Sequence, residues 1–441
     1  MKKFFQFIVT FPAANRNIFI IIIAYALFAI GGSLYWAAIP ILSADIFGLG
    51  TFSISLLIAL IGAVYILVDG PTGVILDYIG YKNGAAFGVF FAAVASFIAI
   101  LEPNLPFFIL SIVFLALSWN TLTLSANAYI LYSAPKNIEG RAFGMYGSFY
   151  SFGVFIATLF VGYVSGWSLA GSGWFFLTMT AISFILIVFF LEPEKRDYNK
   201  NFRQALADYW RGSSQWSRGW LAMKEFSPVS WVAALDGFVG YAFGATIWLV
   251  IPLALANFAN PYLPEGFALG AFEIAGVFAV LIGGFLADRY AKKRLFLGFL
   301  FAEIFAVLAL GFATDNFLFF ISLAFIATVL LDISGPSIDS MLAVIDKNHD
   351  KDGTVYGFMG ILTDLGFIVG PIVGGLAYDS FGLQGVFIFL AGLMFVNWIA
   401  AKILLRNFKE PEAAEARCKG RFCLGGLPRG LGDGGAGLQK L

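Results

Sequence analysis

The chain has 441 residues, of which 60% are hydrophobic and only 12% are charged, and its formal net charge is zero. A soluble domain carries about 25% charged residues, so this composition excludes one and indicates a protein embedded in a lipid bilayer. No nucleic-acid partner is expected.

Apolar runs that are long enough to cross a bilayer as helices, which takes about 20 residues, recur along the whole chain. They predict an all-α membrane protein with twelve spanning helices. The runs cover residues 17–43, 51–76, 84–101, 105–133, 142–165, 172–191, 229–257, 266–287, 295–314, 316–345, 354–378 and 383–405. The first run is too long for the apolar part of a cleavable signal, so we expect it to remain as the first helix.

Composition also divides the chain into regions. We predict an N-terminal six-helix bundle over residues 1–191, a cytoplasmic linker over 192–227, a C-terminal six-helix bundle over 228–405 and a disordered cytoplasmic tail over 406–441. Within the linker, residues 201–211 are compatible with a short amphipathic helix on the membrane surface or with a solvated tether.

Lys and Arg are distributed unevenly between the two sets of loops. If the N-terminus is cytoplasmic, every Lys and Arg falls on the cytoplasmic side, and the opposite loops carry only acids. Such a bias sets membrane orientation, so we expect both termini to be cytoplasmic. We also expect the protein to lie in the plasma membrane and to be a monomer.

Several residues recur at a nearly constant distance along the chain. Four residues of the first half each recur 212 residues later, which indicates two copies of one unit fused head to tail. The matches are Gly32, Trp36, Ile39 and Pro40 with Gly244, Trp248, Ile251 and Pro252. In an apolar chain of this size, such a repeat predicts a two-lobed transporter whose binding site lies between the lobes.

One motif occurs at the ends of the second and eighth predicted helices, at matching places in the repeat. Its residues are Gly73, Asp77 and Gly80 in the first copy, and Gly284, Asp288 and Arg289 in the second. The motif resembles the signature loop of the major facilitator superfamily, and the resemblance covers about residues 1–405. It implies two pseudo-symmetric six-helix bundles that form a transporter and not an enzyme.

The motif aspartates have two physical interpretations. An Asp at a helix end can accept hydrogen bonds from the N-terminus of an adjacent helix, which would hold the lobes together on the cytoplasmic side. Alternatively, Asp77 and Asp288 only terminate their helices. Tyr78 and Ala291 depart from the family pattern, so the contact between the lobes is expected to be weaker or asymmetric.

Six of the acidic side chains inside the predicted spans are taken as candidates, and no Lys or Arg lies in the membrane interior beside them. The six candidates are Asp69, Asp236, Glu303, Asp332, Asp339 and Asp364. An ionisable residue inside a spanning helix is costly and usually functional. A buried carboxylate without a cationic partner favours its protonated form, which is what a proton carrier needs.

The repeat helps to rank these acids, because it pairs Asp332 with Asn120 and Asp339 with Asn127. The family resemblance implies that helices 1, 4, 7 and 10 line a central cavity. We therefore predict Asp332 as the proton or substrate-cation site, with Asp236 second. We assign Asp69, Asp339 and Asp364 to gating hydrogen bonds and expect Glu303 to be a protonated acid bonded within its bundle.

Further cavity side chains follow from the same helices. The predicted cavity residues are Tyr25, Tyr35, Trp36, Asn120, Asn127, Trp248 and Asp339. The two tryptophans share a repeat position, and they could either stack on a substrate or pack together at the extracellular gate.

These observations predict a secondary transporter with alternating access, coupled to protons. Acids without bases favour a neutral or cationic, partly apolar small molecule, and we prefer export of the drug-efflux type. One alternative is a proton-coupled symporter of a neutral nutrient such as a sugar, and another is a transporter-like receptor or scaffold without transport. No metal or cofactor is expected, because the sequence has no metal-ligand cluster, no nucleophile motif and no phosphate-binding loop.

Overall fold

The computed structural model describes residues 15–101, 104–134, 139–161, 168–194, 226–254, 265–346 and 352–408. The predicted amphipathic stretch at 201–211 and the tail from residue 409 onward lie outside these residues. Within helices, the side chains of residues 139–141, 281, 284–285, 288–289, 339, 343–346 and 352–358 are also not described. No β-strand occurs in the described residues, so the predicted all-α membrane fold is confirmed.

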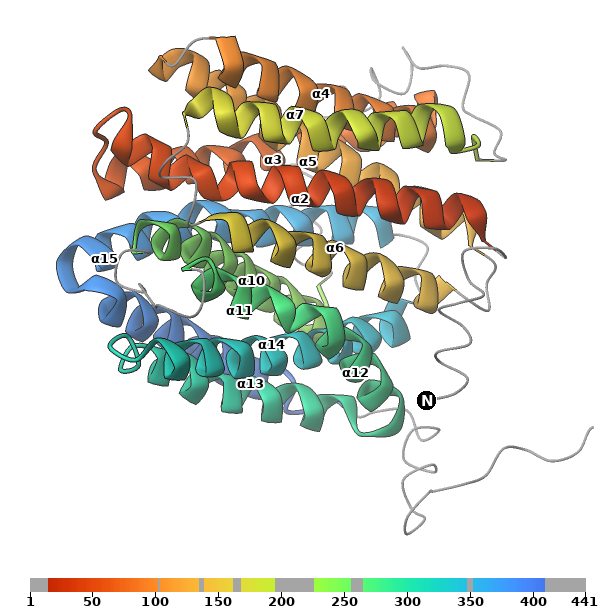
Figure 1. Ribbon diagram of the computed structural model, residues 1–441. Coiled ribbons are helices and arrows are strands. Elements are labelled where there is room, and N and C mark those ends of the chain that lie inside the picture. The colour runs from red at the N-terminus through yellow and green to blue at the C-terminus, as the bar shows by residue number, and fades with distance from the viewer. Residues whose placement is uncertain are drawn as a thin grey trace, which may run out of the picture.

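The N-terminal bundle, or first lobe, consists of the helices before the linker (Figure 1). They are α2 (Arg16–Asp45), α3 (Thr51–Ile79), α4 (Tyr81–Leu101), α5 (Leu105–Ser133), α6 (Glu139–Val161) and α7 (Leu169–Ile185), which η2 (Leu186–Phe190) continues as a π-helical turn. Spans α2 to α6 and the joined α7 and η2 are each long and apolar enough to cross a membrane.

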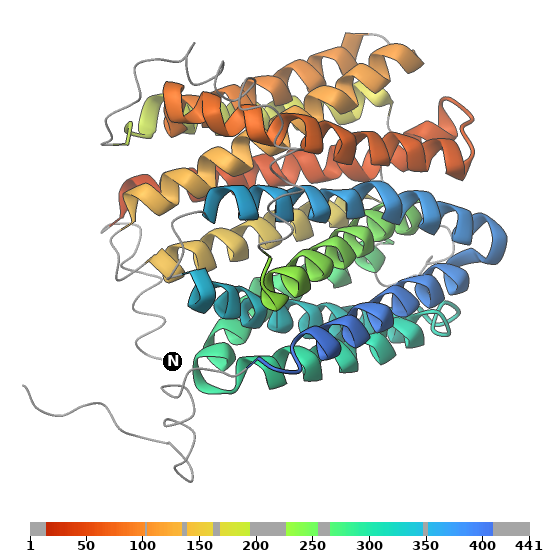
Figure 2. The same ribbon diagram turned by 180° about the vertical axis from the view of Figure 1, so that it is seen from behind.

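The second lobe comprises the elements after the linker (Figures 1 and 2). They are α10 (Pro228–Leu253), α11 (Phe267–Ile274), α12 (Gly276–Arg289), α13 (Lys292–Leu310), α14 (Phe317–Asp346) and α15 (Asp352–Leu404). Helices α11 and α12 are separated by a single residue. Element α15 doubles back at Gly382, whose φ of 63° suits glycine, so it supplies the last two spans.

Local sequence explains where several helices begin. The side chain of Asn104 accepts a hydrogen bond from the backbone N–H of Phe107 at 3.0 Å, and a proline lies in the first turn of α5. Ser168 caps α7 and Ser227 caps α10 in the same way, at 3.1 and 3.0 Å. Such caps satisfy backbone donors that the first turn of a helix leaves unpaired.

Glycines bring the first half of α15 close to α10. A Cβ atom added at Gly370 would lie 2.5 Å from the Cα atom of Ala242, and Gly366 and Gly374 also face α10 closely. Lipid tails are as apolar as the side chains, so membrane helices associate through such close packing at small residues.

We expect Gly370→Ala to destabilise the protein by about 1–3 kcal/mol, because the added methyl group overlaps the backbone of α10. Gly392→Ala is the matched control on the same element, since its Cβ would meet no described atom within 4 Å. The thermal unfolding midpoint of the purified protein in detergent measures both. Equal midpoints for the two variants would contradict the packing argument.

The two lobes meet along three seams. Helix α3 packs on the first half of α15, α6 packs on α11 and α12, and α2 packs on α10. Gly62 illustrates how close the first seam is, because a Cβ there would lie 2.8 Å from the Cβ atom of Phe367. Near the Gly382 turn, a Cβ on Gly375 would lie 3.1 Å from that of Ser55.

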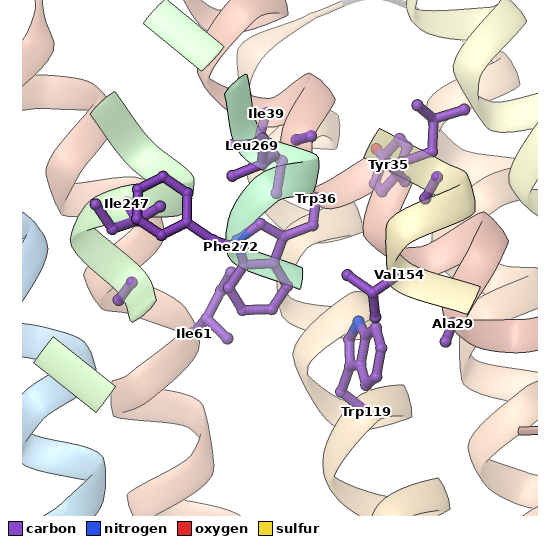
Figure 3. Packing of buried hydrophobic residues seen from close by; sticks show 14 of the residues in the cluster. Ala29, Tyr35, Trp36, Ile39, Ile61, Trp119, Val154, Ile247, Leu269 and Phe272 are labelled. Atoms are coloured by element: carbon purple, nitrogen blue, oxygen red, sulfur yellow. The ribbon is translucent and has the colours of Figure 1, made fainter. Parts of the chain in front are cut away.

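The larger buried core is continuous across the two lobes. The larger cluster contains first-lobe residues together with second-lobe residues from the half nearest the Gly382 turn, among them Ile247, Leu269 and Phe272 (Figure 3). The other half of the second lobe has a separate core, around Val232, Phe296 and others. The lobes are therefore packed together at the Gly382 end, which the predicted orientation makes the extracellular end.

Candidate functional site

Two carboxyl groups from different lobes meet at the seam between α3 and α15. The carboxyl groups of Asp69 and Asp364 lie within hydrogen-bonding reach of one another. The side-chain amide of Asn120, on α5, donates a hydrogen bond to Oδ1 of Asp69. Asp364 is 5% exposed and Asn120 is 7% exposed, so the group is enclosed by protein.

An aromatic group adjoins these carboxyls. Phe367 follows Asp364 by one helical turn, and its ring centroid lies 5.6 Å from that of Trp36, 5.9 Å from Tyr65 and 5.2 Å from Tyr241. These side chains come from α2, α3, α10 and α15, and hence from both lobes. Tyr241 remains 42% exposed, so the aromatic group keeps an accessible face.

A second polar group lies at the seam between α6 and α12. A Cβ on Gly276 would lie 2.7 Å from Oγ of Ser151 and 3.2 Å from Oδ2 of Asp332, so this hydroxyl and this carboxyl flank the same glycine. Close by on α6, Ser148 donates a hydrogen bond of 3.1 Å to the backbone oxygen of Val277. Asp332 thus lies where its own lobe touches the other one.

Glu273 lies near this second group and interacts electrostatically with Asp332. Its Oε1 accepts a hydrogen bond of 2.9 Å from the indole N–H of Trp248. Glu273 also interacts electrostatically with Tyr150, on α6 of the first lobe. The sequence interpretation omitted Glu273, although an acid inside an apolar run of α11 was a visible signal.

The internal repeat relates the two polar groups. Asn120 corresponds to Asp332 at an offset of 212 residues, and Ser151 corresponds to Asp364 at an offset of 213. Related positions of the two units therefore carry polar side chains at two related seams. The side chains differ, and the α3–α15 seam holds the carboxyl pair.

Asp236 and Glu303 belong to the interior of the second lobe. Oδ1 of Asp236 accepts a hydrogen bond of 2.9 Å from Asn397, on the second half of α15. Glu303 is fully buried on α13, and neither of its carboxyl oxygens has a hydrogen-bond partner among the described residues. The bond that we expected for Glu303 within its bundle is thus absent from the described part of the structure.

The predicted cavity tyrosines take different positions. The hydroxyl of Tyr25 bonds with Thr123 at 2.7 Å, and its ring lies 4.7 Å from that of Tyr146. Tyr35 is 1% exposed, bonds with Ser111 at 2.6 Å and stacks on a ring of α7, so it belongs to the core of the first lobe. Asn127 is half-buried on α5.

One hydrogen bond of Asp77, in the first copy of the loop motif, joins two helices of the first lobe. Oδ1 of Asp77 accepts a hydrogen bond of 3.1 Å from the hydroxyl of Tyr81, at the start of the next helix. Gly80 has a φ of 89°, which favours glycine, whereas a Cβ on Gly73 would meet no described atom within 4 Å. The side chains of Asp288, Arg289 and Asp339, and the surroundings of Gly284, lie outside the described residues.

No group of three or more His, Cys, Asp or Glu side chains that could hold a metal ion occurs in the part of the chain that the structure describes. The Lys and Arg side chains described within helices all lie in a first or last turn. They are Arg16, Lys82, Lys292, Lys293, Arg294 and Lys402.

Comparison with known proteins shows which family this chain belongs to. The model of the Major Facilitator Superfamily matches residues 21–260 and 233–426. A Na(+), Li(+), K(+)/H(+) antiporter of Planococcus maritimus is 27% identical over 146 residues, which are 32% of this chain and 34% of the antiporter. The match therefore spans about a third of that relative.

A longer match links the chain to the quinolone resistance protein NorA of Staphylococcus aureus (strain MRSA252), with 19% identity over 83% of this chain and 90% of NorA. The fold is similar to that of a bacterial homologue of the human lysosomal transporter Spinster, with a TM-score of 0.67 and 15% identity over 89% of this chain and 98% of the other. The family match covers most of the chain, and the chain belongs to the major facilitator superfamily of membrane transporters.

Proposed function

We propose that the protein is a proton-coupled secondary transporter that exports a cationic or neutral, partly apolar small molecule. One observation carries the proposal, namely that buried carboxyls lie beside aromatic rings between the lobes while the described bases lie at helix ends. A cation gains from both the carboxylates and the ring faces, whereas an anion finds no base among the described side chains to pair with there.

Phe367, Trp36, Tyr65 and Tyr241 form the proposed substrate surface. Their rings present apolar area from both lobes, so a solute bound there contacts both lobes at once. Proton antiport agrees with the name of one relative, an alkali-cation/H(+) antiporter, and a drug-like solute agrees with the name of another, a quinolone resistance protein.

Asp332 is the proposed coupling residue. It lies against Gly276 and near Ser151 of the opposite lobe, so a change in its charge acts on the α6–α12 seam directly. A ligand shifts a two-state equilibrium only through a difference in its binding to the two states, and a proton on Asp332 supplies such a difference. Asp236 remains the second candidate, although its described partner lies within its own lobe.

The same proposal covers location. We propose that the protein lies in the plasma membrane as a monomer with both termini in the cytoplasm, and the Lys and Arg bias of the loops supports this orientation. In that orientation, the close contact between Ser55 and Gly375 near the Gly382 turn lies at the extracellular end.

Transport by proteoliposomes tests the proposal. Tetraphenylphosphonium, an aromatic cation, should move against its gradient when a pH difference is imposed, and a pH-sensitive dye should report protons moving the opposite way. Empty liposomes and a protonophore are the controls. Protons moving with the solute would indicate a symporter. Absence of flux for a panel of cationic and neutral solutes would favour a receptor or scaffold.

A further inference from the structure

The carboxyl pair at the α3–α15 seam has an unusual electrostatic arrangement. Asp69 belongs to the first lobe and Asp364 to the second, and their carboxyl groups lie within hydrogen-bonding reach. Two ionised carboxylates within hydrogen-bonding reach repel strongly, because the protein around them screens their charges far less than water does. One of the two must hold a proton for the contact to be favourable.

Unpartnered oxygens in the same group support this conclusion. Oδ2 of Asp364 and Oδ1 of Asn120 are buried and have no hydrogen-bond partner among the described residues. The amide of Asn120 is already directed at Asp69 through its Nδ2 atom. The group thus contains more acceptors than donors, and a bound proton supplies an O–H donor where one is missing.

We propose that Asp69 and Asp364 bind one proton between them, and that this shared proton holds α3 of the first lobe against the first half of α15. The proposal goes beyond the transport function because it concerns the equilibrium of the lobes without substrate. It would stand for any transported solute.

The side chains around the carboxyl pair do not change charge below about pH 10, so the pair itself accounts for the titration. Tyr65 on α3 and Tyr241 on α10 interact electrostatically with the pair, and Tyr25 on α2 interacts with both tyrosines. A phenol ordinarily titrates near pH 10, so these rings stay neutral at lower pH. From α5 the pair is faced by the uncharged Asn120.

The sign of the pH dependence follows from proton counting. The closed seam binds one proton more than the separated seam, in which both carboxylates are ionised and hydrated. Closure is therefore favoured at low pH and lost as the pH rises. For a difference of one proton, the ratio of closed to open molecules changes by up to about tenfold per pH unit.

Spin labels at Ser53 and Ser380 measure this equilibrium in the full chain. Both side chains are exposed near the Gly382 end, next to the contact between Ser55 and Gly375. Cys418 and Cys423 are replaced by Ser so that only the labels react. Distances are recorded by double electron–electron resonance in nanodiscs without substrate, from about pH 5 to about pH 9.

We expect the short-distance population to dominate at low pH and to give way to a longer distance as the pH rises. Asp69→Asn and Asp364→Asn should each abolish this response and keep the seam closed, because an amide supplies its own hydrogens to the remaining carboxylate. Asp69→Glu should retain the response with a displaced midpoint. Glu303→Gln, which removes a buried acid away from this seam, should respond as the unmodified protein does.

Three results would overturn the proposal. One is a distance distribution that does not change with pH in the unmodified protein. Another is an unchanged response in monodisperse Asp69→Asn and Asp364→Asn. The third is a response to sodium at constant pH with none to pH itself. If the Asn variants do not fold, Asp69→Glu decides, since an undisplaced midpoint also contradicts the shared proton. If the protein transports no solute in proteoliposomes, these distance measurements still test the shared proton, because they are made without substrate.

Discussion

Asp332→Asn is expected to reduce pH-driven accumulation of tetraphenylphosphonium to the level of protein-free liposomes. The amide has nearly the shape of the carboxyl group, so the contacts with Gly276 and Ser151 can persist. It cannot gain or lose a proton between about pH 4 and about pH 9, so the pH gradient no longer biases the α6–α12 seam. Exchange of labelled for unlabelled solute without a gradient should continue, because exchange needs binding and lobe movement but no net proton transfer.

Glu303→Gln is the matched control for this result. It removes one buried acid from the same lobe, and Glu303 also interacts electrostatically with Asp332. It lies on α13, however, whereas the α6–α12 seam is formed by other helices. We expect Glu303→Gln to retain accumulation. If Asp332→Asn accumulates the solute normally, or if both variants lose accumulation equally, Asp332 is not the coupling residue.

Much of the fold was predictable because its signals are local. The lengths of the apolar runs predict the membrane-spanning helices, and the constant offset between repeated residues predicts two lobes. Small residues such as Gly370 permit close helix packing. The exact helix limits depend on caps such as Ser227, whose effect is confined to one turn. The family match confirms the superfamily that the loop motif suggested.

The candidate site was less predictable, because it depends on how one lobe is placed on the other. The sequence named Asp69 and Asp364 as gating hydrogen-bond partners but did not pair them. Their contact depends on the relative height of α3 and α15, which is set by packing at positions such as Gly62. No pattern within one helix encodes that height.

Tyr35 and Trp36 show a second limit. Both were predicted to line the cavity, yet neighbouring residues on a helix point about 100° apart. Trp36 packs on Phe367 of the other lobe, whereas Tyr35 bonds with Ser111 inside its own lobe. The contact of Glu273 shows the same limit, because its hydrogen bond with Trp248 joins α11 to α10 and no pattern within one helix predicts it.

Phe367→Leu is expected to weaken binding of tetraphenylphosphonium by roughly 3- to 30-fold, which corresponds to about 0.5–2 kcal/mol for a cation over an aromatic face. Leu keeps most of the apolar volume between Gly62 and the rings of Trp36, Tyr65 and Tyr241 but removes the π face. Isothermal titration calorimetry of the purified protein measures the dissociation constant directly.

Comparison with an uncharged ligand separates charge recognition from apolar contact. Triphenylphosphine oxide has similar aromatic area but no positive charge, so its affinity should change far less in the same variant. Phe381→Leu makes the same substitution on α15 at a side chain that is 75% exposed near the Gly382 turn, and it should leave both affinities unchanged. Equal losses for the cation and the neutral ligand would show that Phe367 supplies apolar area alone. In that case, any preference for cations would have to come from the carboxyl groups beside it.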